Sequence, residues 1–154
     1  MARVWAAATA ARDELATPAS LADAREPILA ALGDPGAMAV VAVDDDVVAF
    51  AVATTASPSD EREAEVRFVG VAPSRWREGL GARVMASLVA ALRGRGYEAA
   101  RLLVYVDNAA AIALYERCGW RAAGEPPSVH PRSGRLEQRY RLELGTAAAR
   151  RHPA

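Results

Sequence analysis

Two glycines, Gly79 and Gly81, stand where a helix is expected to begin, shortly after the arginines Arg75 and Arg77. Glycine costs about 1 kcal/mol at an interior helical position, so its use here needs a local reason. A helix N-terminus offers free backbone N–H groups and the positive end of the helix dipole. Without side chains at these positions, a bulky anion can approach those N–H groups. The segment is therefore a candidate phosphate site; a tight strand-to-helix connection without a ligand is the alternative.

Two familiar phosphate-binding motifs are excluded. A dinucleotide-binding fingerprint needs a third glycine three residues after the second, where this sequence has Val84. A P-loop needs a lysine, but all nineteen basic residues of the chain are arginine. The same absence excludes lysine Schiff bases and a pyridoxal-phosphate aldimine. With two histidines, His130 and His152, and one cysteine, Cys118, no histidine/cysteine metal site is expected.

A second segment, "NAAAIALYERCGW" (108–120), has the signals of a short helix. Asn108 is a good N-cap, and Gly119 stands where a left-handed residue ends a helix. Tyr115 is a core aromatic or a functional group. Cys118 is expected in the core, because no histidine is placed to activate it as a nucleophile. His130 is expected on a surface loop, 126–134, which could border a substrate site.

The two segments together resemble the GNAT superfamily of acetyl-CoA-dependent N-acetyltransferases. The acyl-CoA signature of that family runs Val-x-Pro, then Arg/Gln-x-x-Gly-x-Gly/Ala, then a helix; this chain has "VAP" at 71–73 and "GLG" at 79–81. The family's second block has an asparagine and a helix ending in Tyr-x-x-x-Gly-Phe, which matches 108–120 with tryptophan as the last residue. The resemblance covers 64–124. It departs from the family at Trp76, where the family has arginine or glutamine.

The resemblance implies an enzyme that transfers an acetyl group from acetyl-CoA to a primary amine by direct attack. Pantetheine is expected to pair with the strand backbone at 69–71, and the pyrophosphate to lie on the amides of 76–82. The expected cofactor-binding residues are Val69, Gly70, Val71, Trp76, Arg77, Glu78, Gly79, Leu80, Gly81, Ala82, Asn108 and Tyr115. A non-catalytic acyl-CoA-binding sensor or partner-binding module of the same fold is the alternative.

Two residues are expected to carry the proton transfers that such a reaction needs. By the resemblance, Tyr115 is the acid that protonates the departing thiolate. Glu65 is the candidate base, directly or through water, with an exposed glutamate at a strand start as the alternative. Glu63 and Asp60 are weaker candidates for the base. Asn108 is a cofactor contact or a plain helix cap.

Hydrophobic periodicity and turn residues predict the elements that position these groups. Helical structure is expected within 17–34, capped by Ser20, interrupted by Pro27 and ended by Gly33. The further elements expected are a hairpin over 37–54 turning at 44–46, a polar loop at 57–63, a strand at 64–71, a helix at 80–92, a strand at 99–106, a helix at 108–119, a strand from Trp120 and a strand at 135–144.

This order predicts a mixed α+β (α/β) fold. A GNAT-like single domain over 1–145 is expected, with a flexible tail at 146–154. By the resemblance, its central, mostly antiparallel sheet splays between two parallel strands and has helices on both faces.

The composition of the chain limits its partners. The 154 residues have zero formal net charge and 25% charged residues. No nucleic acid is therefore expected as a partner. No apolar run is long enough for a membrane span, and the start of the chain is a poor signal peptide, so a cytoplasmic protein without membrane contact is expected. The expected partners are acetyl-CoA and an unidentified amine acceptor. A homodimer is common in the family and is expected on that ground alone.

Overall fold

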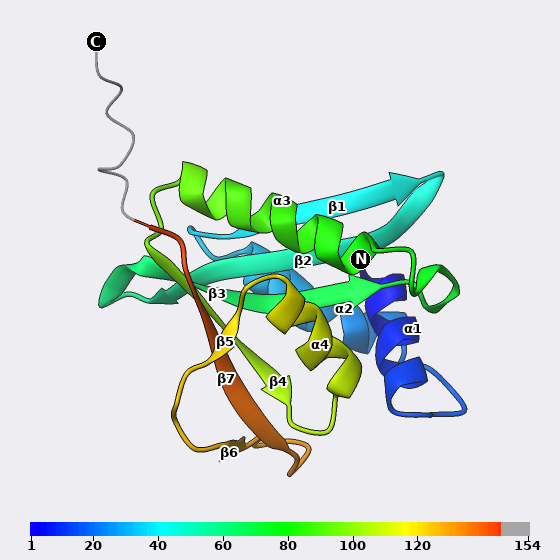
Figure 1. The fold of residues 1–154 in the computed structure, drawn as a ribbon. Helices are drawn as coiled ribbons and strands as arrows, with labels where there is room; N and C mark the ends of the chain where they lie inside the picture. Colours follow the sequence, from blue (N-terminus) through cyan, green and yellow to red (C-terminus); the bar gives the residue numbers. More distant parts are fainter. Residues whose placement is uncertain (146–154) are drawn as a thin grey trace. The chain divides into compact units, whose positions relative to one another are not determined.

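The computed structural model describes residues 1–145 as a mixed set of helices and strands (Figure 1). The elements in chain order are α1 (Ala2–Arg12), α2 (Leu21–Leu32), β1 (Met38–Asp44), β2 (Asp46–Ser57), β3 (Asp60–Val71), the 3-10 turn η1 (Pro73–Arg75), α3 (Leu80–Gly94), β4 (Ala99–Tyr105), α4 (Ala109–Arg117), β5 (Arg121–Ala122), β6 (Ser128–Val129) and β7 (Leu136–Glu143).

The strands hydrogen-bond in the order β1-β2-β3-β4-β7-β5, and β6 pairs with β7. Strand β3 is parallel to β4, while β1–β2, β4–β7, β5–β7 and β6–β7 are antiparallel. The expectation of a mixed α+β fold with a mostly antiparallel sheet and a parallel pair is thus confirmed. The register of the parallel pair runs from Glu63↔Ala99 to Glu65↔Arg101. The splay of the two strands beyond these pairs stays a prediction.

The chain forms two compact units. The first consists of Met1–Thr54 and Val66–Leu88, and the second of Thr55–Glu65 and the chain from Val89. Strands β2 and β3 and helix α3 contribute residues to both units. The single domain over 1–145 stays a prediction, and the expected flexible tail lies outside the described residues.

The core of the first unit forms where α1 and α2 meet the strands. Val4, Ile28, Phe50 and Val52 are buried together, and the ring of Trp5 packs edge-on against Phe50. In Figure 1, α1 (blue) lies beside α2, and the two helices are in contact. Burial of these side chains from two helices and one strand stabilises the unit through the hydrophobic effect.

The second unit is organised by the long antiparallel pair of β4 and β7, whose register runs from Ala99↔Glu143 to Tyr105↔Glu137. Figure 1 shows these two strands side by side. Leu102 of β4 and Trp120, which follows α4, are almost completely buried. The strand pair and these two buried side chains are therefore central to the core of the second unit.

The capping signals predicted from the sequence are confirmed. The side chain of Ser20 accepts a hydrogen bond from the Asp23 N–H, and that of Asn108 accepts one from the Ala111 N–H. Gly119 has φ +89°, in the left-handed region that ends helices. The hairpin turn is also confirmed, with Asp45 at φ +60° between β1 and β2.

One helix is missing from the expected elements, and two expectations are wrong. Helix α1 was not predicted, because its alanines give no apolar stripe. Pro27 lies inside α2 without interrupting it: the Ser20 cap and the buried Ala24 and Ile28 hold the helix on both sides of the proline. The expected polar loop at 57–63 is mostly strand, since β2 ends at Ser57 and β3 begins at Asp60.

The polar residues at the start of β3 form a strand because their charges find partners. Arg62 pairs with Glu98, and Glu63 pairs with Arg141. Cross-strand pairs of opposite charge favour a polar strand that propensity alone would leave as a loop. Strand structure is also missing from the prediction for the 126–134 loop, which contains the two-residue strand β6.

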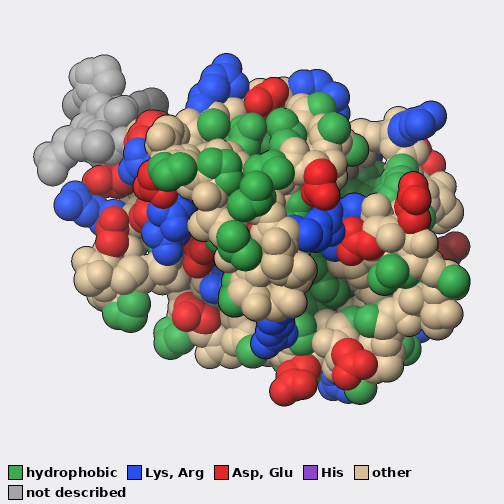
Figure 2. Space-filling view, turned by 90° about the horizontal axis from the view of Figure 1, so that it is seen from below, with side chains coloured by type: hydrophobic (Ala, Val, Ile, Leu, Met, Phe, Trp, Pro, Cys, Tyr) green, Lys and Arg blue, Asp and Glu red, His purple; other side chains and the backbone are tan. Residues whose placement is uncertain are grey.

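Charges of both signs are spread over the surface. On the face shown in Figure 2, arginines and acidic side chains are interspersed among apolar ones, in keeping with the zero net charge of the chain. Within residues 1–145, no helix combines the length and the apolar character that a membrane crossing requires. The same residues contain no group of three or more His, Cys, Asp or Glu side chains arranged to hold a metal ion.

Candidate active site

The turn between β3 and α3 has a curled backbone. Arg77 and Gly79 both have positive φ, +68° and +78°. A Cβ added at Gly79 would meet nothing within 4 Å, so the glycine serves the backbone conformation and not packing. The Gly79 carbonyl accepts the Arg83 N–H at 3.1 Å, which makes Gly79 the N-cap residue directly before α3. The two predicted glycines therefore do mark a helix start.

The start of α3 favours negative charge. No acidic residue stands in its first turn, so the positive end of the helix dipole is not offset there. The N–H groups of Leu80, Gly81 and Ala82 belong to this first turn, where intrahelical acceptors are lacking. The backbone at residues 79–82 therefore has the properties of an anion site.

Several bonds hold the turn in place. Arg75 donates to Glu78 at 2.7 Å and to Asp44 at 2.8 Å. These two carboxylates raise the pKa of Arg75, Glu78 contributing most. The Ala72 N–H donates to the Val48 carbonyl, also at 2.8 Å. The guanidinium of Arg75 is therefore occupied by ion pairs with Glu78 and Asp44.

Gly70, expected as a backbone contact of pantetheine, has a packing role of its own. A Cβ at this position would lie 2.6 Å from Cε1 of Phe50, closer than any real contact. Any side chain here would displace the ring at the centre of the first unit. Val69 and Val71, its neighbours on β3, are half-buried.

In the second unit, Tyr115 lies on α4 and is 8% exposed. Its ring centroid is 6.4 Å from that of Trp120. The ring is thus a core aromatic, while its role as an acid stays a prediction. Asn108 caps α4 through its side-chain oxygen, 3.2 Å from the Ala111 nitrogen.

Glu65 is not an exposed glutamate at a strand start. Its side chain is 19% exposed, and Oε1 lies 3.8 Å from Nε of Arg101 on β4. The Arg101 Nε is buried and has no hydrogen-bond partner. Arg101 also donates to the Ala56 carbonyl at 3.1 Å. An arginine thus stands beside the proposed base.

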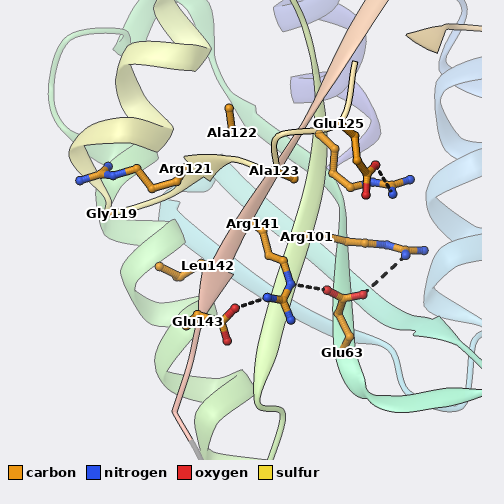
Figure 3. A pocket seen from close by; sticks show the side chains of 11 residues that line it. Glu63, Arg101, Gly119, Arg121, Ala122, Ala123, Glu125, Arg141, Leu142 and Glu143 are labelled. Atoms are coloured by element: carbon orange, nitrogen blue, oxygen red, sulfur yellow. Dashed lines mark hydrogen bonds and ion pairs between the residues drawn. The ribbon is translucent and has the colours of Figure 1, made fainter. Parts of the chain in front are cut away.

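Glu63 belongs to an ion-pair cluster (Figure 3). Its carboxylate lies between Arg141, at 2.9 Å, and Arg101, at 3.5 Å. Arg141 also pairs with Glu143, and its pKa is raised, mainly by the hydrogen bond to Glu63. Glu63 therefore has a structural role, which makes it a poor base. Asp60 accepts the Arg62 N–H at the start of β3.

The cluster borders an open cavity of about 740 Å³ in the second unit. Charged side chains dominate its lining, which comprises Glu63, Arg101, Gly119, Arg121, Ala122, Ala123, Glu125, Arg139, Arg141, Leu142 and Glu143. Arg139 donates to Glu125 at 2.7 Å. Figure 3 shows Arg121 turned away from the cluster around Glu63.

His130 is engaged in its own loop. Its Nδ1 accepts the N–H groups of Ser133, at 3.1 Å, and Arg132, at 3.3 Å. Its ring packs edge-on against Tyr105 of β4. Cys118 is half-buried, and burial raises the pKa of its thiol, which disfavours the nucleophilic thiolate.

One cluster of side chains near the end of β4 was not predicted from the sequence. The guanidinium of Arg135 stacks 3.9 Å from the centroid of Tyr105 and pairs with Asp107 at 2.6 Å. The only signal in the sequence was a tyrosine and an aspartate at a strand end.

Of the predicted site residues, Val69–Ala82 belong to the first unit, and Glu65, Asn108 and Tyr115 to the second.

Comparison with known proteins agrees with this architecture. The profile of the acetyltransferase (GNAT) family matches residues 4–120, most of the chain. The chain therefore belongs to the acetyltransferase (GNAT) family.

Particular relatives are similar over shorter or longer stretches. The chain is 43% identical over 61 residues to the mycothiol acetyltransferase of Clavibacter michiganensis subsp. michiganensis, covering 40% of this chain and 20% of that protein. It is 33% identical over 87 residues to the mycothiol acetyltransferase of Streptomyces coelicolor, covering 56% of this chain and 28% of that protein. The chain thus matches only a fifth to about a quarter of the length of these curated relatives.

A solved structure is similar over most of its length. The ribosomal-protein-S18-alanine N-acetyltransferase of Escherichia coli superposes with a TM-score of 0.69 at 26% identity, covering 90% of this chain and 85% of that chain. A GNAT-family structure from Desulfovibrio desulfuricans superposes with a TM-score of 0.72 at 25% identity, covering 94% and 92%. Both similarities support the fold described above.

Proposed function

We propose that this chain is an N-acetyltransferase that moves an acetyl group from acetyl-CoA to a primary amine by direct attack. The observation that carries the proposal is the start of α3 in a chain of this family. Positive φ at Arg77 and Gly79 and the absence of an acidic residue in the first turn suit the diphosphate of CoA. Acetyl-CoA is then a co-substrate, bound on the amides of 76–82 and along the backbone of 69–71.

In this proposal, two side chains move the protons. An amine with a pKa near 10 is almost entirely ammonium at neutral pH, so a base must remove a proton before attack. Glu65 takes that role, directly or through water. Tyr115 gives a proton to the CoA thiolate as the thioester carbon–sulfur bond breaks. Asn108 adds a cofactor contact to its capping role.

The experiment is a pair of measurements on the same preparation. Calorimetry measures acetyl-CoA binding, and chromatography follows the release of CoA and the acetylated product in the presence of amines. The panel holds a peptide with an N-terminal alanine, a lysine peptide, and small amines with and without a thiol, since relatives are named for ribosomal-protein alanine and for mycothiol.

Release of CoA that depends on an amine, with an acetylated product, is the expected result. Binding without release for every amine would favour the non-catalytic module instead. Absence of acetyl-CoA binding would contradict both. The proposal also includes a primary amine as the acceptor, a cytoplasmic location and a homodimer. Sedimentation velocity tests whether the chain is a homodimer.

A further inference from the structure

We propose that Trp76 is a positioning residue, which holds the turn between β3 and α3 in the shape that receives the CoA diphosphate. Its indole Nε1 donates to the Val71 carbonyl at 2.8 Å, across the 3-10 turn at Pro73–Arg75. This bond joins the end of β3 to the residue just before the curled segment. The inference rests on the proposed function, since it concerns the same anion site.

The turn needs such a restraint because its backbone is strained. Arg77 follows Trp76 directly and has φ +68°, although it carries a side chain. A non-glycine residue in the left-handed region persists only where its surroundings enforce it. Trp76 itself is extended, at φ −65° and ψ 150°, so the sign of φ changes between these two neighbouring residues.

Further restraints act on other parts of the turn. Ala72 is tied to Val48, and Arg75 to Asp44 and Glu78. These contacts hold the first half of the turn and its outer side. The Trp76 N–H donates to the Pro73 carbonyl at 3.3 Å within the 3-10 turn, and the indole bond ties Trp76 back to the end of β3.

Hydrogen bonding, more than burial, explains a tryptophan at this position. Its side chain is 45% exposed, so the ring contributes little to the core. The indole of Trp76, held by its hydrogen bond to Val71, can restrain the backbone of the turn without occupying the space of the anion. The amides of 77–82 are then preorganised before the ligand arrives, and preorganisation lowers the cost of binding.

The test compares Trp76→Phe with the unchanged chain on two thioesters. Acetyl-CoA carries the diphosphate, whereas S-acetylpantetheine has the same thioester without it. For the variant, the KM of acetyl-CoA is expected to rise about fivefold with kcat unchanged, as for loss of one hydrogen bond. The KM of S-acetylpantetheine is expected to change less than that of acetyl-CoA, because this thioester lacks the diphosphate.

Trp5→Phe is the matched control. It also removes an indole N–H from the first unit, where the Trp5 ring packs edge-on against Phe50 and Phe68. Its helix α1 contacts the 3-10 turn, so this control also reports any effect that reaches the turn through packing alone. It is expected to lower stability without changing the ratio of KM values for the two thioesters. Hydrogen exchange of the ligand-free chain gives a second measurement: the amides of 77–82 should exchange several-fold faster in Trp76→Phe and at the original rate in Trp5→Phe.

Equal effects on both thioesters, or unchanged exchange at 77–82, would overturn the positioning role while leaving the proposed function standing. An unchanged chain that binds no acetyl-CoA would overturn the proposed function and this inference with it; the exchange rates would still report whether the indole bond holds the turn.

Discussion

A single side chain, Tyr115, combines packing with the proposed chemistry. Its ring is buried against Trp120, as the core interpretation expects. Its sequence position in the "NAAAIALYERCGW" block is the reason for proposing an acid. The two roles use different atoms, the ring and the hydroxyl, so one substitution can separate them.

Tyr115→Phe keeps the ring and removes the hydroxyl. If the hydroxyl protonates the departing thiolate, kcat should fall about 100-fold, at the lower end for a general acid because a thiolate is already a fair leaving group. The affinity for acetyl-CoA should change much less, since the effect belongs to the transition state. Steady-state kinetics and calorimetry measure the two quantities.

A normal kcat with a lowered thermal midpoint would instead support a purely structural tyrosine. A normal kcat with normal stability would mean that another group is the acid.

Residue types and spacing predicted some of these positions well and others poorly. Caps are local, so Asn108 and Gly119 could be assigned from their neighbours alone. The surroundings of Glu65 could not be predicted, because Arg101 reaches it from another strand. The reason for Gly70 was equally hidden, since the ring that needs its space is Phe50 on β2.

At the scale of elements, the start of α3 gives the sharpest test of the cofactor site. Gly81→Glu adds bulk and negative charge to the first turn of the helix. The affinity for acetyl-CoA should fall at least about tenfold, about 1.4 kcal/mol. The helix itself should tolerate the change, because an acidic residue near a helix N-terminus is favourable. Calorimetry measures the affinity, and circular dichroism the fold.

Ala90→Glu is the control, since it adds the same charge at an exposed position further along α3. It should leave the affinity unchanged. Equal affinities for the unchanged chain and a folded Gly81→Glu variant would remove residues 76–82 as the diphosphate site.

The pairing of β7 with its surroundings predicts a pH dependence. Tyr140 is buried and donates to Glu116 at 3.2 Å; burial, and then Glu116, raise the pKa of Tyr140. In the unfolded chain the phenol ionises at its ordinary pKa of about 10. The folded chain keeps its proton to higher pH, so this contribution to stability is present below about pH 10 and is lost as the pH rises through the folded pKa.

The free energy of unfolding in urea should therefore fall above about pH 10, and fall less steeply in Tyr140→Phe. Comparing the two chains removes the contributions of the other tyrosines and of Cys118. Parallel curves for both chains would show that Tyr140 titrates alike in the folded and unfolded states.

Elements with strong local signals were predicted within a few residues, as for α2, α3 and β4. The start of β3 was missed because its strand structure depends on distant partners. Glu63 and Arg141 are 78 residues apart in the chain, and no local pattern announces their pairing. Helix α1 was missed for the opposite reason: alanine favours a helix, but an alanine-rich segment has little amphipathic pattern to detect.

At the scale of the whole molecule, the composition itself leads to a prediction about the reaction. The 154 residues contain nineteen basic side chains, all of them arginine. A guanidinium stays protonated at any ordinary pH and is no nucleophile, whereas a lysine amine is a common acceptor of acetyl groups. These residues therefore offer no side-chain primary amine to acetyl-CoA, and the α-amino group of the polypeptide is the primary amine that remains.

Intact-mass spectrometry after prolonged incubation with acetyl-CoA should show at most one stable acetyl group, and peptide mapping should place it on the first residue. Brief hydroxylamine treatment removes any thioester formed on Cys118 before the measurement. A lysine-bearing reference protein in the same tube should gain several acetyl groups, which controls for the chemical reactivity of acetyl-CoA. Two or more hydroxylamine-stable acetyl groups on this chain would contradict the prediction, because they would require acetylation of guanidinium groups. Without such self-modification, acetylation found on an added peptide or amine reports transfer to the acceptor alone.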